Sequence, residues 1–151
     1  MFQLEQLSLK RCIRPTNATG IPWLVILSDG SDFAYGFAAY ARWKLEDRSF
    51  CCQLIMAKSR IAPMSKLSTP QMELNGAVLS KRGRKVIEKE MRLDFEKVLQ
   101  LVDSETVLNM INKTSTRFEV YEGVGIGEIQ AATDACWAWM SRKNNTVQRT
   151  G

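Results

Sequence analysis

The chain has 151 residues, which is enough for one domain with a buried core of its own. Its composition is 45% hydrophobic and 25% charged, as in ordinary globular proteins, and no apolar run is long enough to span a membrane. The net charge of +5 fits a partner that carries phosphate groups, although many basic domains bind nothing. The sequence contains no histidine, which excludes serine–histidine and cysteine–histidine nucleophiles and imidazole ligands for zinc or iron. Any chemistry must therefore come from carboxylates.

The four cysteines lack the spacing of a zinc site. None belongs to a C-x-x-C pair, and Cys51 and Cys52 are adjacent, so on a strand their side chains would point to opposite faces. We therefore expect an intracellular, reducing environment. Residues 1–21 mix charges with turn formers and contain no apolar signal core, which favours a lead-in from a longer polypeptide. One domain is then expected over residues 22–151.

The first part of this domain predicts a three-stranded antiparallel meander. The expected strands cover residues 23–28, 34–45 and 49–58. A long helix is then expected over residues 70–91, with Ser68 or Thr69 as its cap and Pro70 as its first residue. Apolar residues recur in it at approximately helical spacing: Met72, Leu74, Val78, Leu79 and Val86.

The second part predicts a strand over residues 95–103, a short helix over 104–114 and a last strand over 136–140. The segment 117–133 is expected to form a helix, with a strand as the alternative because it is rich in valine, isoleucine and glycine. The order is therefore β-β-β-α-β-α-α-β. This order predicts an α/β fold with a five-stranded mixed sheet flanked by helices, followed by a polar tail.

An acidic residue stands at the end of two expected strands and near the start of the long expected helix. Asp29 ends the first strand, Glu73 lies in the first turn of the helix, and Asp103 ends the fourth strand. Each has an ordinary structural explanation. Asp29 followed by Gly30 suits a turn, and Glu73 gains from the helix macrodipole. Asp103 with Ser104 can cap the next helix.

Together the three acids predict more than turns and caps. If the fourth strand pairs in parallel with the first, Asp29 and Asp103 emerge at neighbouring strand ends. Carboxylates gathered in this way repel one another unless cations neutralise them, and Mg²⁺ prefers such oxygen ligands. Two such ions, about 3.5–4 Å apart, could clamp the attacking and leaving oxygens of a phosphodiester. The acids therefore indicate a magnesium site.

Several stretches of the sequence have a distinctive pattern. The most specific are SDGSDFAYGFAAYAR and AKSRIAPMSKLSTPQMELNGAVL. The same pattern continues in VDSETVLNMIN, RFEVYEGVGIGEIQ and WAWMSRKNN, and it includes KRCIRP near the start. Together they resemble the ribonuclease H domain of retroelement polymerases, most closely the BEL/Pao type of long-terminal-repeat retrotransposon. The resemblance covers essentially the whole chain.

The resemblance implies an RNase H-like fold and hydrolysis of the RNA strand of RNA–DNA hybrids. It implies that Asp29, Glu73 and Asp103 hold two Mg²⁺ ions, with Mn²⁺ able to substitute. The hybrid would be recognised by its shape, phosphates and 2′-hydroxyls. An upstream reverse transcriptase domain of the same polyprotein would be the partner, and the expected location is the cytoplasm, in a virus-like particle. No membrane partner is expected. A resolvase or integrase core of the same superfamily is the less favoured assignment, because integrases place their glutamate late in the chain.

The sequence departs from the family where a fourth acid is expected. The matching run is NTVQ, so Gln148 takes the place of the acid. Its amide oxygen could contact a metal or a water molecule, but the negative charge is lost, which should weaken one metal site. The alternative function is therefore a catalytically weakened or inactive RNase H-like module that binds nucleic acid or supports a polymerase.

Basic and polar residues supply further candidates for nucleic-acid binding. Lys81, Arg84 and Lys85 in the long helix could contact the backbone of the hybrid. The alternative is a solvated helix face on which neighbouring glutamates offset the positive charge. Ser31, Ser104 and Asn109 could contact the sugar–phosphate backbone near the metals, although turn and cap roles explain the serines equally well.

Aromatic residues are expected mainly to pack the core. Trp137 and Trp139 are two residues apart and share one face of the last expected strand, with base stacking as the alternative to core packing. The aromatic residues around the second strand are expected to pack the sheet; they are Phe33, Tyr35, Phe37 and Tyr40.

Overall fold

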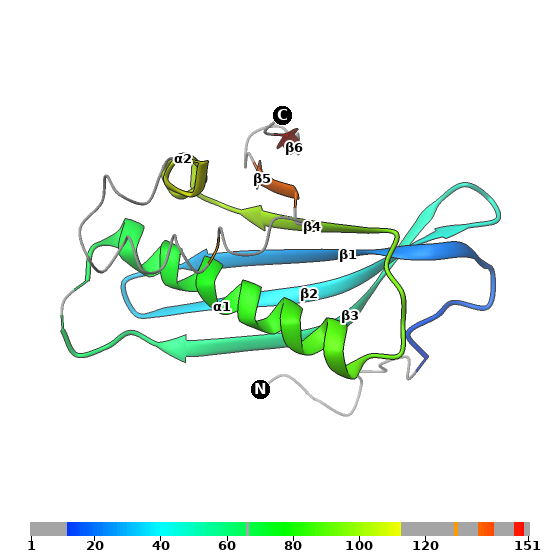
Figure 1. Ribbon diagram of the computed structural model, residues 1–151, viewed down its shortest axis with the longest axis horizontal. Helices are drawn as coiled ribbons and strands as arrows, with labels where there is room; N and C mark the ends of the chain where they lie inside the picture. Colours follow the sequence, from blue (N-terminus) through cyan, green and yellow to red (C-terminus); the bar gives the residue numbers. More distant parts are fainter. Residues whose placement is uncertain (1–11, 66, 113–128, 130–135, 141–146, 150–151) are drawn as a thin grey trace, which may run out of the picture.

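A mixed β-sheet forms the frame of the protein, and a long helix crosses one of its faces (Figure 1). The computed structural model describes residues 12–65, 67–112, 129, 136–140 and 147–149. The elements, in chain order, are β1 (Ala18–Gly30), β2 (Ala34–Leu45), β3 (Phe50–Ile61), α1 (Thr69–Glu90), β4 (Lys97–Val102), α2 (Glu105–Asn112), β5 (Cys136–Met140) and β6 (Val147–Arg149).

The strand order in the sheet is β3-β2-β1-β4-β5-β6. β1, β2 and β3 form the antiparallel meander that the sequence predicts. β4 pairs in parallel with β1, and β5 pairs in parallel with β4. The expected five-stranded mixed sheet is therefore confirmed. β6 lies in the expected polar tail and adds a sixth, antiparallel strand next to β5.

The meander strands are longer than periodicity alone predicts. β1 begins at Ala18, inside the expected lead-in, because Ala18 and Thr19 pair with the last residues of β2. A break in register follows Thr19, where Gly20 adopts a positive φ of 69°. β3 extends to Ile61 because that residue pairs with Ala34 at the start of β2. Long-range pairing thus lengthens segments whose own patterns are weak.

Helix α1 begins with a complete capping box. The Ser68 side chain accepts a hydrogen bond from the Gln71 N–H at 3.4 Å, and the Gln71 side chain accepts one from the Ser68 N–H at 3.0 Å. Ser68 is therefore the cap, Thr69 the first helical residue and Pro70 the second. As a result Glu73 lies in the second turn of α1, one turn later than the sequence analysis placed it.

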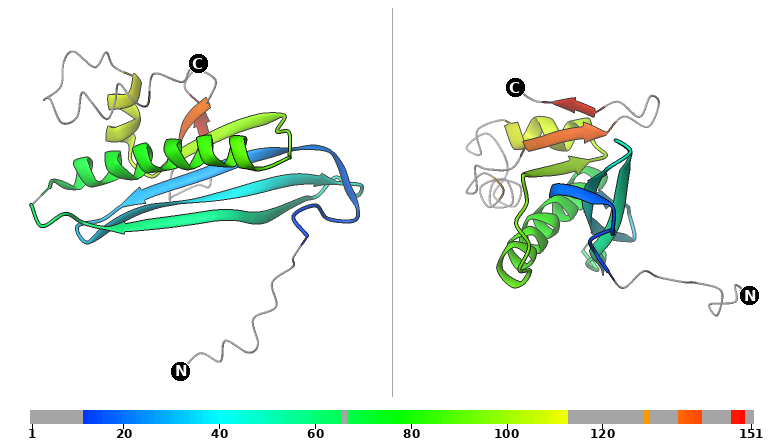
Figure 2. Two further views of the ribbon diagram at one scale, coloured as in Figure 1. Left: turned by 60° about the horizontal axis from the view of Figure 1, so that its bottom comes forward. Right: turned by 90° about the vertical axis from the view of Figure 1, so that its right-hand side faces the viewer.

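Both helices pack on the same face of the sheet (Figure 2). One core cluster joins α1 to β1 and β2 and includes Leu24, Ile26 and Ile87. A second joins α1 and α2 to β4 and β5, and it contains Trp137, which confirms the expected core role of this residue. Phe33 differs from the expectation: it is 83% exposed, because it lies at the turn between β1 and β2, beyond the helix-covered face.

The predicted helix over 117–133 lies outside the part of the chain that the structure describes, except for Ile129, which is buried in the second core cluster. The side chain of Trp139 also lies outside it, so the expected packing of this residue stays a prediction. Among the described residues, no helix has both the length and the apolar character needed to cross a membrane.

Candidate active site at the ends of the parallel strands

The pairing of β1 with β4 brings two of the predicted acids to the same edge of the sheet. Ser28 pairs with Val102 in parallel register, so Asp29 and Asp103 are the next residues on two adjacent strands. Both line one hollow of about 420 Å³. Because parallel strands end at the same edge, residues 74 positions apart in sequence reach one site.

The backbone of helix α1 packs very closely against the end of β1. A Cβ added at Gly30 would lie 2.5 Å from the Met72 carbonyl carbon and 2.6 Å from the Glu73 nitrogen. A Cβ added at Gly76 would lie 2.6 Å from the Asp29 carbonyl oxygen. Only glycine fits at such distances. The two glycines therefore hold the backbone of Glu73 next to the strand end that carries Asp29.

The three carboxylates nevertheless do not form a ready-made metal cluster. Within the described residues, no three aspartate, glutamate or cysteine side chains are arranged so that they could hold a metal ion. The Asp29 carboxylate accepts a hydrogen bond from the Gly30 N–H at 2.8 Å. Asp29 is exposed, whereas Glu73 and Asp103 are half-buried. The backbone thus brings the acids to one region, and their assignment as metal ligands stays a prediction.

By donor type, the three residues fit Mg²⁺. All three offer hard carboxylate oxygens, which this ion prefers over nitrogen and sulfur. Two of them share a solvent-reached hollow, which would allow the ion to keep some of its water ligands. The floor of the hollow is largely apolar and includes Leu27, Ala38 and Leu101.

One known protein family matches most of the chain. Its sequence matches the family described as Pao retrotransposon-like RNaseH-like domain over residues 1–104. The chain belongs to this family. The matched residues include all three acids, whereas β5 and β6 lie beyond them.

The Pao-type domain is also similar to solved RNase H structures. The N-terminal RNase H domain of Rv2228c from Mycobacterium tuberculosis, solved as a fusion with maltose-binding protein, is 15% identical with a TM-score of 0.48, over 82% of this chain and 86% of that chain. LC11-RNase H1 in complex with an RNA/DNA hybrid is 11% identical with a TM-score of 0.48, over 82% and 88% of the two chains. The protease–reverse transcriptase of Prototype Foamy Virus is 11% identical with a TM-score of 0.49, over 78% of this chain and 17% of that chain. A comparison with curated protein sequences gave no match.

The polar residues proposed near the metals have local structural roles in the Pao-type domain. The Ser31 hydroxyl donates to the Ala34 carbonyl at 3.0 Å and so closes the turn between β1 and β2. The Ser104 hydroxyl accepts from the Val107 N–H at 3.3 Å and caps α2. Ser31 also lines the hollow with the two aspartates, and Asn109 is exposed on α2. Contact of these residues with a nucleic acid stays a prediction.

The basic residues of α1 divide into buried and exposed members. Lys81 is 2% exposed, and its Nζ donates to the Ile129 carbonyl at 3.0 Å. Arg84 is 8% exposed and pairs with Glu88, Nε to Oε1, at 2.7 Å. Both side chains lie on the packed side of α1, so contact with nucleic acid would require them to leave their buried partners, and their role in binding stays a prediction. Lys85 is exposed and stays a candidate.

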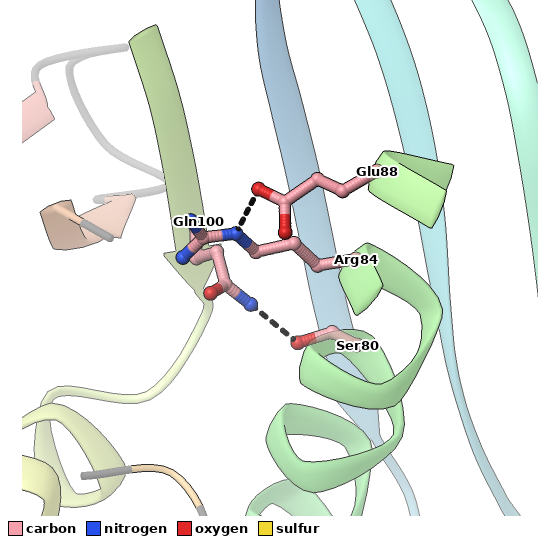
Figure 3. Close-up of polar contacts among 4 residues, drawn as sticks. All are labelled: Ser80, Arg84, Glu88 and Gln100. Carbon is pink, nitrogen blue, oxygen red and sulfur yellow. Dashed lines mark hydrogen bonds and ion pairs between the residues drawn. The ribbon is translucent and has the colours of Figure 1, made fainter. Parts of the chain in front are cut away.

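A buried polar contact joins α1 to β4 beside this ion pair (Figure 3). The Gln100 amide donates to the Ser80 hydroxyl at 3.2 Å, and that hydroxyl donates to the Ala77 carbonyl at 2.7 Å. Gln100 and Ser80 are each 1% exposed. The hydrogen bonds compensate for burying these groups and fix the register of α1 against β4, and hence the position of Glu73 along the sheet.

Gln148 lies in β6, where its Cα pairs with that of Trp139 on β5. Trp139 pairs in turn with Val102, and Val102 with Ser28, so Gln148 is level with the strand ends that precede the two aspartates. Three strand spacings of about 4.8 Å each separate β6 from β1. The Cα of Gln148 is therefore aligned across the sheet with the residues that precede the two aspartates, but it is about 14 Å from β1. Its role as a metal ligand stays a prediction.

Gly30 and Gly76 are not among the site residues that the sequence predicts, yet Gly76 permits the close approach of α1 to Asp29. The signal was present in the sequence: a glycine inside a long helical pattern often marks a packing requirement. A hydrogen bond from the Thr69 hydroxyl to Asp32, at 3.1 Å, also ties the start of α1 to the turn after β1.

Proposed function

We propose that this domain is an endonuclease that hydrolyses the RNA strand of RNA–DNA hybrids with the help of two Mg²⁺ ions. One observation carries the proposal: Asp29 and Asp103 follow paired positions on adjacent parallel strands and line the same hollow. The membership of the chain in an RNaseH-like family supports it.

Asp29, Glu73 and Asp103 would hold the two ions, and Mn²⁺ could substitute for Mg²⁺. When bound, the ions would supply a nucleophilic water and neutralise charge on the phosphodiester. The fold would position these residues for the ions: strand pairing places the two aspartates at neighbouring strand ends, and the glycine contacts of α1 hold the backbone of Glu73 beside them.

The hybrid would be recognised through its shape and its 2′-hydroxyls across the wide minor groove. The net charge of +5 would assist by attracting phosphates. Ser31, Asn109 and Lys85 are the exposed or site-lining candidates for such contacts. We further propose that the domain works beside a reverse transcriptase domain of the same polyprotein, in cytoplasmic virus-like particles.

The test is a cleavage assay with end-labelled RNA annealed to DNA, in Mg²⁺, in Mn²⁺ and in a chelator. Cleavage should require the metal, and Asp29→Asn or Asp103→Asn should lower it by at least about 100-fold, because even indirect partners of a catalytic metal contribute 10–100-fold. Asp32→Asn is the matched control, since Asp32 is an exposed acid on the adjoining turn. Equal cleavage by Asp29→Asn and the wild type, or cleavage without metal, would disprove the proposal.

A second candidate function is a catalytically weakened module that binds hybrids without cutting them. One observation favours it: Gln148 stands where the resemblance to the family predicts a further acid. Isothermal titration with Mg²⁺ and hybrid binding measured beside the cleavage gel separate the two functions. Tight binding of the hybrid without cleavage in Mn²⁺ would establish the second.

A further inference from the structure

The sheet carries a group of aromatic and cationic side chains far from the acids. Trp23 lies six residues before Asp29 on β1, which corresponds to about 20 Å along the strand. Its neighbours Leu24 and Ile26 face α1 in the core, so Trp23 faces the opposite side of the sheet. Among the elements that the structure describes, both helices pack on the α1 side.

Strand register explains why cations surround Trp23. Arg42 on β2 and Lys97 on β4 are its direct cross-strand partners. The Arg42 guanidinium carbon is 5.3 Å from the centroid of the Trp23 ring, and the Lys97 nitrogen is 5.3 Å from the same centroid. Arg42 also lies 3.7 Å from the centroid of the Phe50 ring. We call Trp23, Arg42, Phe50 and Lys97 the aromatic platform.

A hollow of about 500 Å³ opens beside this platform. Trp23, Arg42, Lys44 and Phe50 line it, together with Glu96. The Glu96 carboxylate accepts a hydrogen bond from the Trp23 indole N–H at 3.0 Å, which fixes the plane of the indole. The surface therefore carries three cations, Arg42, Lys44 and Lys97, and one carboxylate, that of Glu96. This excess of positive charge favours an anionic ligand.

The exposure of Phe50 points to the kind of anion. Phe50 is 55% exposed, although a phenyl ring gains most by burial. Arg42 stacks on it and thereby limits its rotation. Ring faces held in place beside cations are the features with which proteins bind unpaired bases and the phosphates between them. An acidic peptide would use the charges but would gain little from the rings.

We propose that the aromatic platform binds single-stranded nucleic acid. A base would stack on the exposed ring of Phe50, Trp23 would hold Arg42 and Lys97 in place, and phosphates would contact Arg42, Lys44 and Lys97. A duplex would not fit this mode, because its bases are already stacked on one another. The inference does not depend on the proposed nuclease function: the platform lies at the other end of β1, and binding there needs no metal.

The test is fluorescence anisotropy with a labelled oligothymidylate of about ten nucleotides, in a chelator, against a strand of equal length made of abasic sites. The thymidine strand should bind at least about fivefold more tightly, and Phe50→Ala should remove most of that difference. Leu54→Ala is the matched control, because Leu54 is on the same strand and face and is also 55% exposed. The affinity of the Leu54→Ala protein for the thymidine strand should match that of the wild-type protein.

The charges are tested separately through the salt dependence of binding. Lys44→Gln should reduce the slope of log affinity against log salt by about 0.7, as expected for one phosphate contact on a single strand. Lys89→Gln, whose side chain is 82% exposed on α1, should leave the slope unchanged. Thermal unfolding of each variant shows whether the fold is kept. Because Lys44 is exposed, its substitution does not disturb the core.

Three results would overturn the inference. They are equal binding of the thymidine and abasic strands, equal losses in Phe50→Ala and Leu54→Ala, and displacement of the strand by polyglutamate as readily as by unlabelled oligothymidylate. Asp29→Asn should bind the single strand as the wild type does. Failure of hybrid cleavage with intact strand binding would therefore contradict the nuclease proposal alone.

Discussion

Gly76 in α1 lies directly against the backbone of Asp29: a Cβ on Gly76 would be 2.6 Å from the Asp29 carbonyl oxygen. Gly76→Ala should therefore move α1 away from β1, although alanine favours a helix by about 1 kcal/mol over glycine. We expect the free energy of unfolding to fall by about 1–3 kcal/mol. Hybrid cleavage should fall as well, because Glu73 moves with the helix.

Chemical denaturation and the cleavage assay check this prediction together. Lys89→Ala is a suitable control, since the Lys89 side chain is 82% exposed on the same helix and its substitution changes no close packing. A Gly76→Ala protein as stable and as active as the control would show that α1 can shift without disturbing the site.

The capping box at the start of α1 gives a second prediction. Ser68→Ala removes the oxygen that accepts from the Gln71 N–H, so the free energy of unfolding should fall by about 1 kcal/mol. Denaturant titration measures the change. Ser65→Ala, in the exposed loop before the helix, should have a much smaller effect. Equal effects of the two substitutions would argue against the cap.

The buried guanidinium of Arg84 gives a third prediction. Its Nη1 atom is buried without a hydrogen-bond partner among the described residues, and Glu88, its ion-pair partner, is partly exposed. Arg84→Met keeps the volume and removes the charge, so stability should change by less than about 1 kcal/mol or rise. Glu88→Gln should be more harmful, because it leaves the buried cation without its carboxylate. Denaturation curves for the two variants decide this order.

The same Arg84→Met variant tests the burial of this residue by a different measurement. Because the side chain is 8% exposed, the affinity for an RNA–DNA hybrid should match that of the wild type. Lys85→Met, one residue away and exposed, should weaken binding if α1 faces the hybrid. Anisotropy with a labelled hybrid would contradict the assignment if Arg84→Met alone lost affinity.

The position of Gln148 gives a fourth prediction. β6 is three strand spacings from β1, so the backbone at position 148 is about 14 Å from the strand of Asp29. We expect Gln148→Asp to change hybrid cleavage by less than about threefold, well under the tenfold that corresponds to 1.36 kcal/mol. A gain of about tenfold or more would instead show that the side chain reaches the metals and that the wild-type site lacks one ligand.

The sequence by itself determined the order of the described elements from β1 to β5, whereas it did not predict β6, and the predicted helix over 117–133 lies largely outside the described residues. β2 and β5 have the predicted bounds, and α1 begins within one residue of the prediction. The reason is that alternation, helical periodicity and the Ser68 cap act between residues close in sequence. The acids at the strand ends followed from the same patterns.

Only the tertiary structure decided which side chains are buried and which meet across strands. Lys81 and Arg84 are charged, so no local pattern predicts their burial. They are buried because α2, β4 and Ile129 pack against the side of α1 that carries them. The stacking of Trp23 and Arg42 depends on a register between separate strands. Such contacts arise from packing segments that are distant along the chain, and no local pattern encodes the distances that result.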